Sequence, residues 1–345
     1  MENLPPLTEI LAAIPQGALY HDLIGRRAPL AVYNISIQQV WSRLEKVVQR
    51  LEAISKYKLS EKDRSGIPGI PDMPNTLDSY RELLYSLMEY LEDCKGILRS
   101  LFQSVETFKK NPHVRNYEAD INQYRDYVGK IVNKIKHQQA RLRGVFLYND
   151  DSFIPGFYVE KAIGSDVVGP DHDIHEGGVT GISFYRDVRY HFVEVLLSAD
   201  SLGSAVSDIA EMSPPNDEEN VNDRDSSGVR SLADRISQLP LTCFLNEVGK
   251  EEPFILAPDS CVNGLDLIIG YGPPMWKFKS FLDFEVSVQS MGDGVTKSFK
   301  FPYLGTDCAI MIEKQLLEVK RKLRYLPRKR WPFLDLTDDT SGSSD

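Results

Sequence analysis

Hydrophobic positions in the first half of the chain repeat at intervals of three and four residues, the spacing of one face of an α-helix. The longest run begins at Leu77 and continues to Phe108, and we expect one unbroken helix there that ends near Lys110. Such heptad spacing is typical of coiled coils and helical bundles. The run comprises Leu77, Tyr80, Leu84, Leu87, Leu91, Cys94, Leu98, Leu101, Val105 and Phe108.

Two further stretches have the same periodicity. The first starts at Ser36, which has the spacing of a capping box with Gln39, and the second places apolar residues on one face between Tyr117 and Leu142. Basic residues crowd the C-terminal half of the second stretch, where they suit the helix dipole. Residues 36–143 are therefore predicted to form a helical bundle or coiled coil.

The segments that flank this bundle have a different character. Residues 1–35 show no sustained period, and we interpret them as an extended N-terminal arm. A loop at 58–75 holds several prolines and glycines that cannot continue a helix.

At Gly144 the apolar period changes from 3.6 to 2, and aromatic and β-branched runs alternate with Gly, Pro, Asn and Asp. This pattern is typical of strands and turns, and we extend it through 180–199. A last helix is expected from Thr306 or Asp307 to about Leu326. Residues 144–327 are thus predicted to form a domain with a mostly antiparallel sheet and a C-terminal helix, and the whole chain is predicted to be α+β.

The stretch 213–230 is polar and acidic and holds almost no large apolar residue. Such a composition buries too little surface to offset the entropy of ordering, so we interpret it as a disordered insertion.

The chain has 345 residues, with 40 Lys and Arg against 50 Asp and Glu, which gives a formal charge of −10. This acidity disfavours nucleic acid as the primary partner. No apolar run approaches the ~20 residues of a membrane span, and Met1–Gln16 lacks a signal-peptide pattern. The four cysteines are scattered and form no metal-binding pair. We therefore expect an intracellular protein with no membrane partner and no cofactor.

The sequence PDHDIHEGG at 170–178 gathers two imidazoles and three carboxylates, from Asp171 to Glu176. His172 and His175 are weak candidates for zinc ligands or for a general acid and base. A solvated loop is the alternative, because no further ligands with recognisable spacing occur. No motif of a known enzyme class occurs either, so no catalytic residue is assigned.

Seven basic residues cluster between Lys320 and Arg330 in this otherwise acidic chain. Two short basic groups separated by YLP are typical of a nuclear-import sequence. The solvated end of a helix and a phosphate-binding patch are the alternatives. The import residues would be Lys320, Arg321, Lys322, Arg328, Lys329 and Arg330.

The final segment, 328–345, is first basic and then apolar and acidic. Its residues Phe333, Leu334, Asp335, Leu336, Thr337, Asp338 and Asp339 resemble a SUMO-interacting motif, in which a short segment adds as a strand to the edge of SUMO. The resemblance implies SUMO as a partner. Folding back onto the sheet or bundle and docking into another groove are the alternatives.

Together these features favour a non-enzymatic adaptor or scaffold subunit of an intracellular, nuclear or cytoplasmic, protein assembly, such as a chromatin-associated complex. Partner proteins would bind the helical face and the terminal segment, and oligomerisation of the chain is an alternative. The expected partner-binding leucines are Leu84, Leu87, Leu91, Leu98 and Leu101. A metal-dependent hydrolase or metal-binding protein built on Asp171–Glu176, and a nucleic-acid binder built on local basic patches, are the alternatives.

Overall fold

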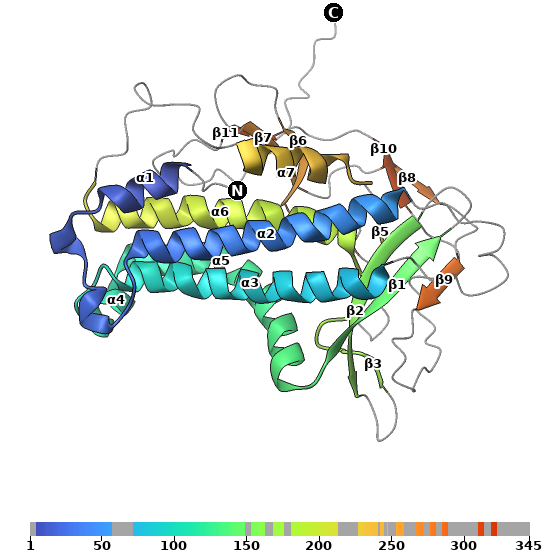
Figure 1. Ribbon diagram of the computed structural model, residues 1–345, viewed down its shortest axis with the longest axis horizontal. Helices are drawn as coiled ribbons and strands as arrows, with labels where there is room; N and C mark the ends of the chain where they lie inside the picture. Colours follow the sequence, from blue (N-terminus) through green and yellow to red (C-terminus); the bar gives the residue numbers. More distant parts are fainter. Residues whose placement is uncertain are drawn as a thin grey trace, which may run out of the picture.

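A computed structural model shows an elongated bundle of helices with its largest sheet toward one end (Figure 1). The structure describes residues 5–56, 72–148, 153–162, 168–175, 181–212, 227–240, 242–244 and 247, and the strand segments 253–258, 266–271, 277–280, 285–288, 310–313 and 319–322. It is mostly helical, and all its described strand pairs are antiparallel, which confirms the α+β class.

Helices account for most of the residues that the structure describes. Seven α-helices and two short 3-10 helices are described: α1 Pro5–Ala13, η1 Gln16–Ala18, η2 Asp22–Ile24, α2 Pro29–Ser55, α3 Met73–Arg99, α4 Val105–Lys110, α5 Pro112–His137, α6 Phe184–Ile209 and α7 Ser227–Gln238.

The N-terminal region is more helical than the sequence predicts. Helix α1 lies within the segment expected to be an extended arm, and α2 begins at Pro29, not at Ser36. Proline suits the first turn of a helix because the backbone N–H that it lacks has no partner there. Ser36 lies inside α2 and its hydroxyl donates to Asp93 of α3, so the apparent capping box is a contact between helices.

The single helix expected to run from Leu77 to Lys110 is two helices. Helix α3 ends at Arg99, and α4 restarts after Ser104, whose hydroxyl oxygen accepts a hydrogen bond from the backbone N–H of Thr107 at 3.1 Å. The apolar spacing continues across the break because Phe108 returns to the same core. Spacing alone therefore does not reveal the interruption.

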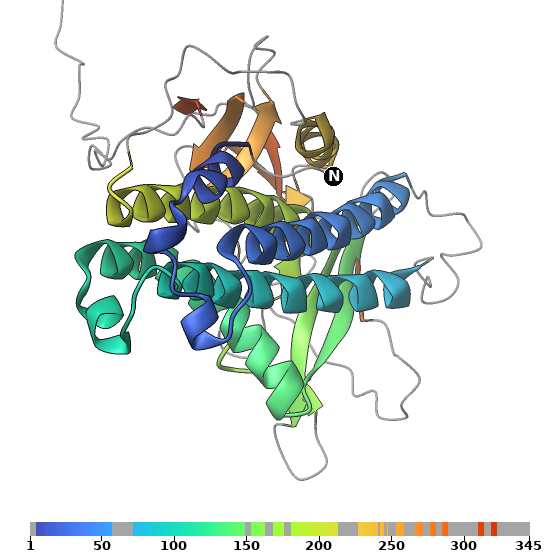
Figure 2. The same ribbon diagram turned by 60° about the vertical axis from the view of Figure 1, so that its left-hand side comes forward.

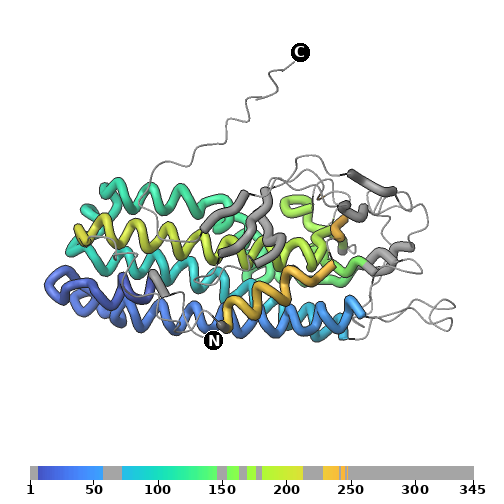
Figure 3. Tube along the Cα trace, turned by 90° about the horizontal axis from the view of Figure 1, so that it is seen from above, coloured from blue at the N-terminus to red at the C-terminus, as the bar shows by residue number. Residues whose placement is uncertain are grey.

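The prediction of strands in 180–199 is wrong beyond Ser183. Only Ile182–Ser183 is extended, as β4, and the 26-residue helix α6 follows. Helix α6 is buried on nearly every side, against α1, α2, α3 and α5 (Figures 1 and 3). The Phe, Tyr and Val residues of α6 have strand propensity, which tertiary packing overrides.

The largest sheet has the strand order β3-β2-β1-β9, and β4 also pairs with β2. Figure 2 shows the last turns of α5 leading from the bundle to this sheet. Its strands are β1 Arg141–Tyr148, β2 Phe153–Ala162, β3 Val168–Pro170, β4 Ile182–Ser183 and β9 Glu285–Val288.

Two three-stranded sheets, in the orders β5-β10-β8 and β11-β7-β6, hold the remaining strands. The helix expected from Thr306 to Leu326 is not confirmed, because the described parts of that stretch, β10 and β11, are strands. The strands are β5 Thr242–Cys243, β6 Pro253–Pro258, β7 Asp266–Tyr271, β8 Lys277–Ser280, β10 Ile310–Glu313 and β11 Val319–Lys322.

One hydrophobic core extends from the bundle into the sheet. It joins Leu87 of α3 to Phe157 of β2 and Leu202 of α6, so it crosses the domain boundary expected at residue 143, which falls inside β1. Helix α7 adds Leu232 and Ile236 to the same core. Its first residues lie in the predicted insertion 213–230, and residues 213–226 of that insertion lie outside the described part of the chain.

Candidate functional site

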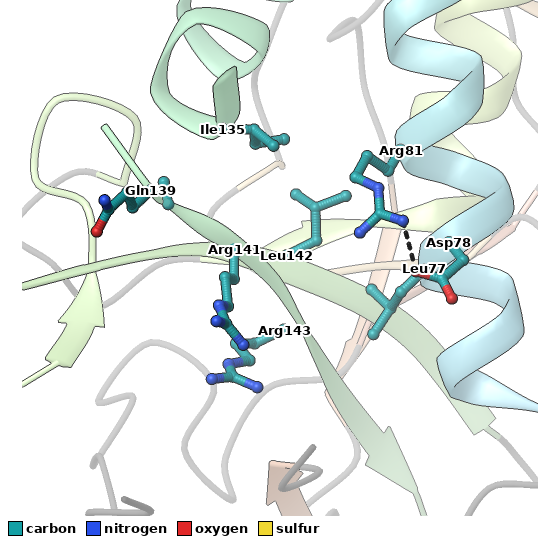
Figure 4. Close-up of a pocket in the computed structure, with 9 residues that line it drawn as sticks. Leu77, Asp78, Arg81, Ile135, Gln139, Arg141, Leu142 and Arg143 are labelled. Carbon is teal, nitrogen blue, oxygen red and sulfur yellow. Dashed lines mark ion pairs between the residues drawn. The ribbon is translucent and has the colours of Figure 1, made fainter. Parts of the chain in front are cut away.

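A groove of about 410 Å³ lies where the N-terminal half of α3, the end of α5 and the start of β1 meet. A concave site of this size that mixes apolar walls with a few charged groups is typical of ligand or partner binding. The lining residues are Leu77, Asp78, Arg81, Ile135, Gln139, Ala140, Arg141, Leu142 and Arg143 (Figure 4).

The groove lies beside the start of β1. Five successive residues, from Gln139 to Arg143, line it. Arg141, Leu142 and Arg143 belong to β1, whereas Gln139 and Ala140 form the turn that leads into the strand.

The described strand pairing agrees with this arrangement. Strand β2 pairs with all eight residues of β1, whereas β9 pairs on the other side only from Val145 to Tyr148. Among the described strands, none pairs with this side of Arg141–Gly144. Within the described strands, the N-terminal half of β1 thus has a partner on one side, β2.

The two faces of β1 differ in chemistry at this edge. Figure 4 shows Leu142 pointing to the side of the strand where Ile135 and Arg81 lie, whereas Arg141 and Arg143 both point to the opposite side. Leu77 of α3 lies on the side of Leu142. The groove therefore has an aliphatic side beneath α3 and a basic side across the sheet.

The charged groups of the groove differ in how firmly they are held. Arg143 is 5% exposed, and its Nη2 lies 2.7 Å from Oε1 of Glu160 on β2, so a buried carboxylate fixes its position. Arg81 pairs with Asp78 at 3.0 Å on the surface, and exposed pairs of this kind contribute little free energy and rearrange easily. Arg141 is exposed. Arg81 and Arg141 are thus the two solvent-exposed cations of the groove.

The local fold explains why these residues meet. Helix α5 ends at His137, and Gln139 adopts a left-handed backbone conformation, φ 56°, that turns the chain directly into β1. The backbone N–H of Ala140 donates to the carbonyl of Lys134 at 3.2 Å and fixes this turn.

The sequence showed that basic residues cluster here, but it gave no sign that they line a groove. Lys134, Arg141 and Arg143 belong to the basic residues that crowd this stretch, one of the local basic patches considered for nucleic acid. The structure separates them, because Lys134 pairs with Asp171 and Asp173 and Arg143 pairs with Glu160. The hydrogen bond to Asp173 is the largest cause of the raised pKa of Lys134.

The histidine-rich loop is built into the sheet. Nε2 of His175 accepts a hydrogen bond from the backbone N–H of Val159 at 2.8 Å, so this nitrogen is not available as a zinc ligand. His172 is exposed, and Glu176 lies outside the described residues. Within the described part of the chain, no group of three His, Cys, Asp or Glu residues is arranged to hold a metal ion. His175, Asp171 and Asp173 therefore have structural contacts, with Val159 and Lys134.

A buried polar network that the sequence did not indicate lies between α3, α5 and α6. The hydroxyl of Tyr80 donates to Asp187 and lies 2.9 Å from Nε2 of His191. The hydroxyl of Tyr124 lies 3.0 Å from Nδ1 of the same histidine, and Tyr127 donates to Asp187 at 2.7 Å. The spacing of Asp187 and His191, one helical turn apart, is the only sequence signal, and it was hidden in a stretch predicted as strands.

The five leucines expected to bind partners lie inside the molecule. They are between 0 and 7% exposed and belong to the core that α2, α5 and α6 share with α3. A partner would reach them only if one of these helices were displaced, so this structure does not support binding through that face. Coiled-coil pairing is likewise not confirmed. The residues are Leu84, Leu87, Leu91, Leu98 and Leu101.

The predicted import sequence falls only partly on described residues, and the predicted SUMO-interacting segment does not fall on them. Lys320–Lys322 lie in β11, which pairs with β7. Arg328–Arg330 and the segment Phe333–Asp339 lie outside the described residues.

Comparisons with known proteins were negative. No family model matches the chain, and no curated protein or solved structure is detectably similar to it. Among the described helices, none combines the length and apolarity needed to cross a bilayer. The functional assignment therefore rests on the geometry of the groove.

Proposed function

We propose that this protein is a non-enzymatic adaptor of an intracellular, nuclear assembly, and that it engages a partner protein through the groove between α3, α5 and β1. The observation that carries this proposal is the groove itself, which combines an aliphatic side with a basic side. These are groups that recognise a polypeptide.

The lining of the groove also favours binding over catalysis. It holds arginine, aliphatic and amide side chains with one exposed carboxylate, and its described residues include no hydroxyl, thiol or imidazole for nucleophilic or proton-transfer chemistry. The import residues Lys320–Arg330 and the SUMO-type segment Phe333–Asp339 remain predictions that fit a nuclear adaptor. In this proposal the partner protein binds the groove and not the leucine face of α3.

The test is quantitative affinity purification of the full chain from cells. We compare the natural chain with an Arg81→Glu/Arg141→Glu variant, which reverses the charge of the groove. Arg115→Glu is the matched control, because Arg115 is an exposed arginine near the opposite end of α5. We expect a defined partner set that the groove variant loses and the control keeps.

Deletion of 328–345 in the same experiment tests the terminal segment separately. We expect it to remove a different subset, including SUMO-modified proteins, and to lower the nuclear fraction. An identical partner set for the natural chain, the groove variant and the control would reject the groove as the docking site.

A further inference from the structure

Going beyond the proposed adaptor function, we infer that the end of the bundle opposite the groove docks on an anionic lipid bilayer. This end, which we call the tip, consists of the loop His21–Arg27 and the helix α4. Figures 1 and 2 show both segments at the same end of the bundle. The groove lies at the start of α3 and the end of α5, whereas the tip adjoins the end of α3 and the start of α5.

Two large aliphatic side chains protrude at the tip. Leu23 is 73% exposed and Val105 is 53% exposed, and the only other large hydrophobic side chain exposed among the described residues is Ile35, at 42% on α2. Removing such side chains from water is favourable, and the interface of a bilayer offers an apolar environment for them. The tip therefore carries the two most exposed of these side chains at one end of an elongated molecule.

The loop that carries Leu23 is held in place. The backbone N–H of Arg26 donates to the carbonyl of His21 at 2.9 Å and closes the turn around Leu23. The guanidinium of Arg26 occupies the space on α3 that a Cβ atom on Gly96 would need, so this side chain fastens the loop to the bundle. Leu23 is thus presented to the solvent by a turn with fixed ends.

Helix α4 presents Val105 in a comparable way. Phe108 is buried, and its ring centroid lies 5.7 Å from that of Phe102, which anchors the helix to the bundle. Val105 and Lys109 are four positions apart, so they lie on the same face of α4, and both are exposed. An aliphatic side chain and a cation therefore face the solvent together.

The tip is basic although the chain is acidic. Residues 20–28 and 99–111 together hold five Lys or Arg and two Asp or Glu, whereas the whole chain has a formal charge of −10. The two acids already have neighbours, because Glu106 pairs with Lys110 and Asp22 lies 3.4 Å from His21. Each basic residue close to an anionic membrane surface strengthens binding about fivefold.

These features favour a bilayer over a protein pocket. Leu23 and Val105 belong to separate segments, and a soft lipid surface accepts both without a matched pair of cavities. Stable docking on a membrane surface requires two signals, and the tip supplies apolar side chains beside cations. The sequence predicts no membrane partner because it contains no apolar run long enough to span a bilayer, but docking on the surface needs no spanning helix.

Sedimentation of the full chain with lipid vesicles tests the inference. One set of vesicles is phosphatidylcholine alone, and the other contains about 30% phosphatidylserine. We expect the anionic vesicles to bind the chain at least about tenfold more strongly, and we expect added salt to weaken the binding because it screens exposed charges. Equal binding to both sets, or absence of binding to the anionic vesicles at millimolar lipid, overturns the inference.

Charge reversals locate the docking surface. Arg27→Glu/Lys109→Glu should weaken binding to the anionic vesicles at least about tenfold, because two attractive charges become repulsive. Lys46→Glu/Lys130→Glu is the matched control, since both lysines are exposed and lie on α2 and α5 away from the tip. The control should stay within about twofold. Equal weakening by both pairs would mean a general effect of net charge and would overturn the inference.

A fluorescent side chain reports insertion directly. Leu23→Trp should shift its emission to shorter wavelength on the anionic vesicles, because the indole leaves water for the headgroup region. Ile35→Trp, at the exposed position on the side of α2, should not shift. An unchanged emission at position 23, or equal shifts at both positions, contradicts insertion of the tip. Binding to soluble polyglutamate without binding to vesicles would assign the tip to an acidic protein and would overturn the inference.

The outcome is independent of the proposed function. The groove variant Arg81→Glu/Arg141→Glu should keep its binding to vesicles, and the tip variant Arg27→Glu/Lys109→Glu should still bind the partner of the groove. Loss of vesicle binding in the groove variant would place the lipid contact at the groove and would overturn docking through the tip.

Discussion

Asp187 and His191 lie one turn apart on helix α6, and Oδ2 of Asp187 is 3.3 Å from Nε2 of His191. Both side chains are completely buried, and hydroxyl groups from α3 and α5 complete their hydrogen bonds. Buried polar groups stabilise a fold only when they are satisfied, and they penalise any alternative packing that separates them. The network therefore fixes the relative positions of three helices.

This network gives the first prediction. Tyr80→Phe removes the hydroxyl that contacts both Asp187 and His191 and should lower the free energy of unfolding by about 2 kcal/mol, because two buried groups lose a hydrogen bond. Urea denaturation measures the change. Tyr85→Phe, at a half-buried position on the same helix, is the control and should change it by less than about 0.5 kcal/mol. Similar losses for both variants would argue against the network.

The second prediction concerns Arg189, a buried arginine that holds the end of α7. Its guanidinium donates to the carbonyls of Tyr185 at 2.9 Å, Pro240 at 3.1 Å, Leu239 and Ser237. These bonds satisfy carbonyls at the C-terminus of α7, where positive charge also suits the helix dipole. Arg189→Met should therefore destabilise α7 selectively.

Hydrogen exchange read by mass spectrometry tests this. We expect the amides of Ser227–Gln238 to exchange at least about tenfold faster in Arg189→Met, while those of α3 change little. Arg235→Met is the comparison, since Arg235 binds Glu52 of α2 through a half-exposed pair and should have the smaller effect. If Arg235→Met loosens α7 more than Arg189→Met does, the capping role is wrong.

The third prediction concerns Gly156 on β2. A Cβ atom there would overlap the carbonyl oxygen of Ile182 and the ring of Phe244. The carbonyl belongs to the paired strand β4 and cannot move without breaking the sheet. Gly156→Ala should cost about 3 kcal/mol or more. Gly17→Ala is the control, because no atom lies within 4 Å of the added Cβ. Thermal denaturation should show a large loss only for Gly156→Ala.

The fourth prediction is a loss of stability in alkali. Burial raises the pKa of Cys94 from 9.0 to about 12, and it raises the pKa of Tyr33 and Tyr124 well above 10.0. These groups stay protonated in the folded state while they ionise in the unfolded chain. Their contribution is therefore complete below pH 9 and is lost as the pH rises through 9 and 10 toward the folded values.

Urea denaturation at pH 8, 9, 10 and 10.5 measures this dependence. Each buried group should contribute a slope of up to about 1.4 kcal/mol per pH unit above its ordinary pKa. Tyr33→Phe should flatten the profile above pH 10 without changing it near pH 8.5. A stability that stays constant from pH 8 to 10.5 would show that these groups ionise freely in the folded protein.

Some elements followed directly from the sequence. The apolar spacing located α3 and α5, because both helices have one buried and one solvated face. The change of period at Gly144 indicated the sheet, although β1 starts three residues earlier, at Arg141. Turn residues and strand propensity could mark these segments because the information is local.

Other elements could not be found this way. Helix α6 is rich in Phe, Tyr and Val, which favour strands locally, and it packs as a helix against α1, α2, α3 and α5. The groove joins residues of α3, α5 and β1 that are up to 66 positions apart, from Leu77 to Arg143. A single sequence carries no signal of which distant segments come together.

The sequence alone determined that the chain is α+β, that its first half forms amphipathic helices and that its charge is acidic, because these properties depend on residue type and short-range spacing. Only the tertiary structure decided that the leucines of α3 face the interior, that Asp187 meets His191 and two tyrosines from other helices, and that residues of α3, α5 and β1 line one groove. These depend on which surfaces cover one another, and burial is a property of the assembled chain that no local pattern specifies.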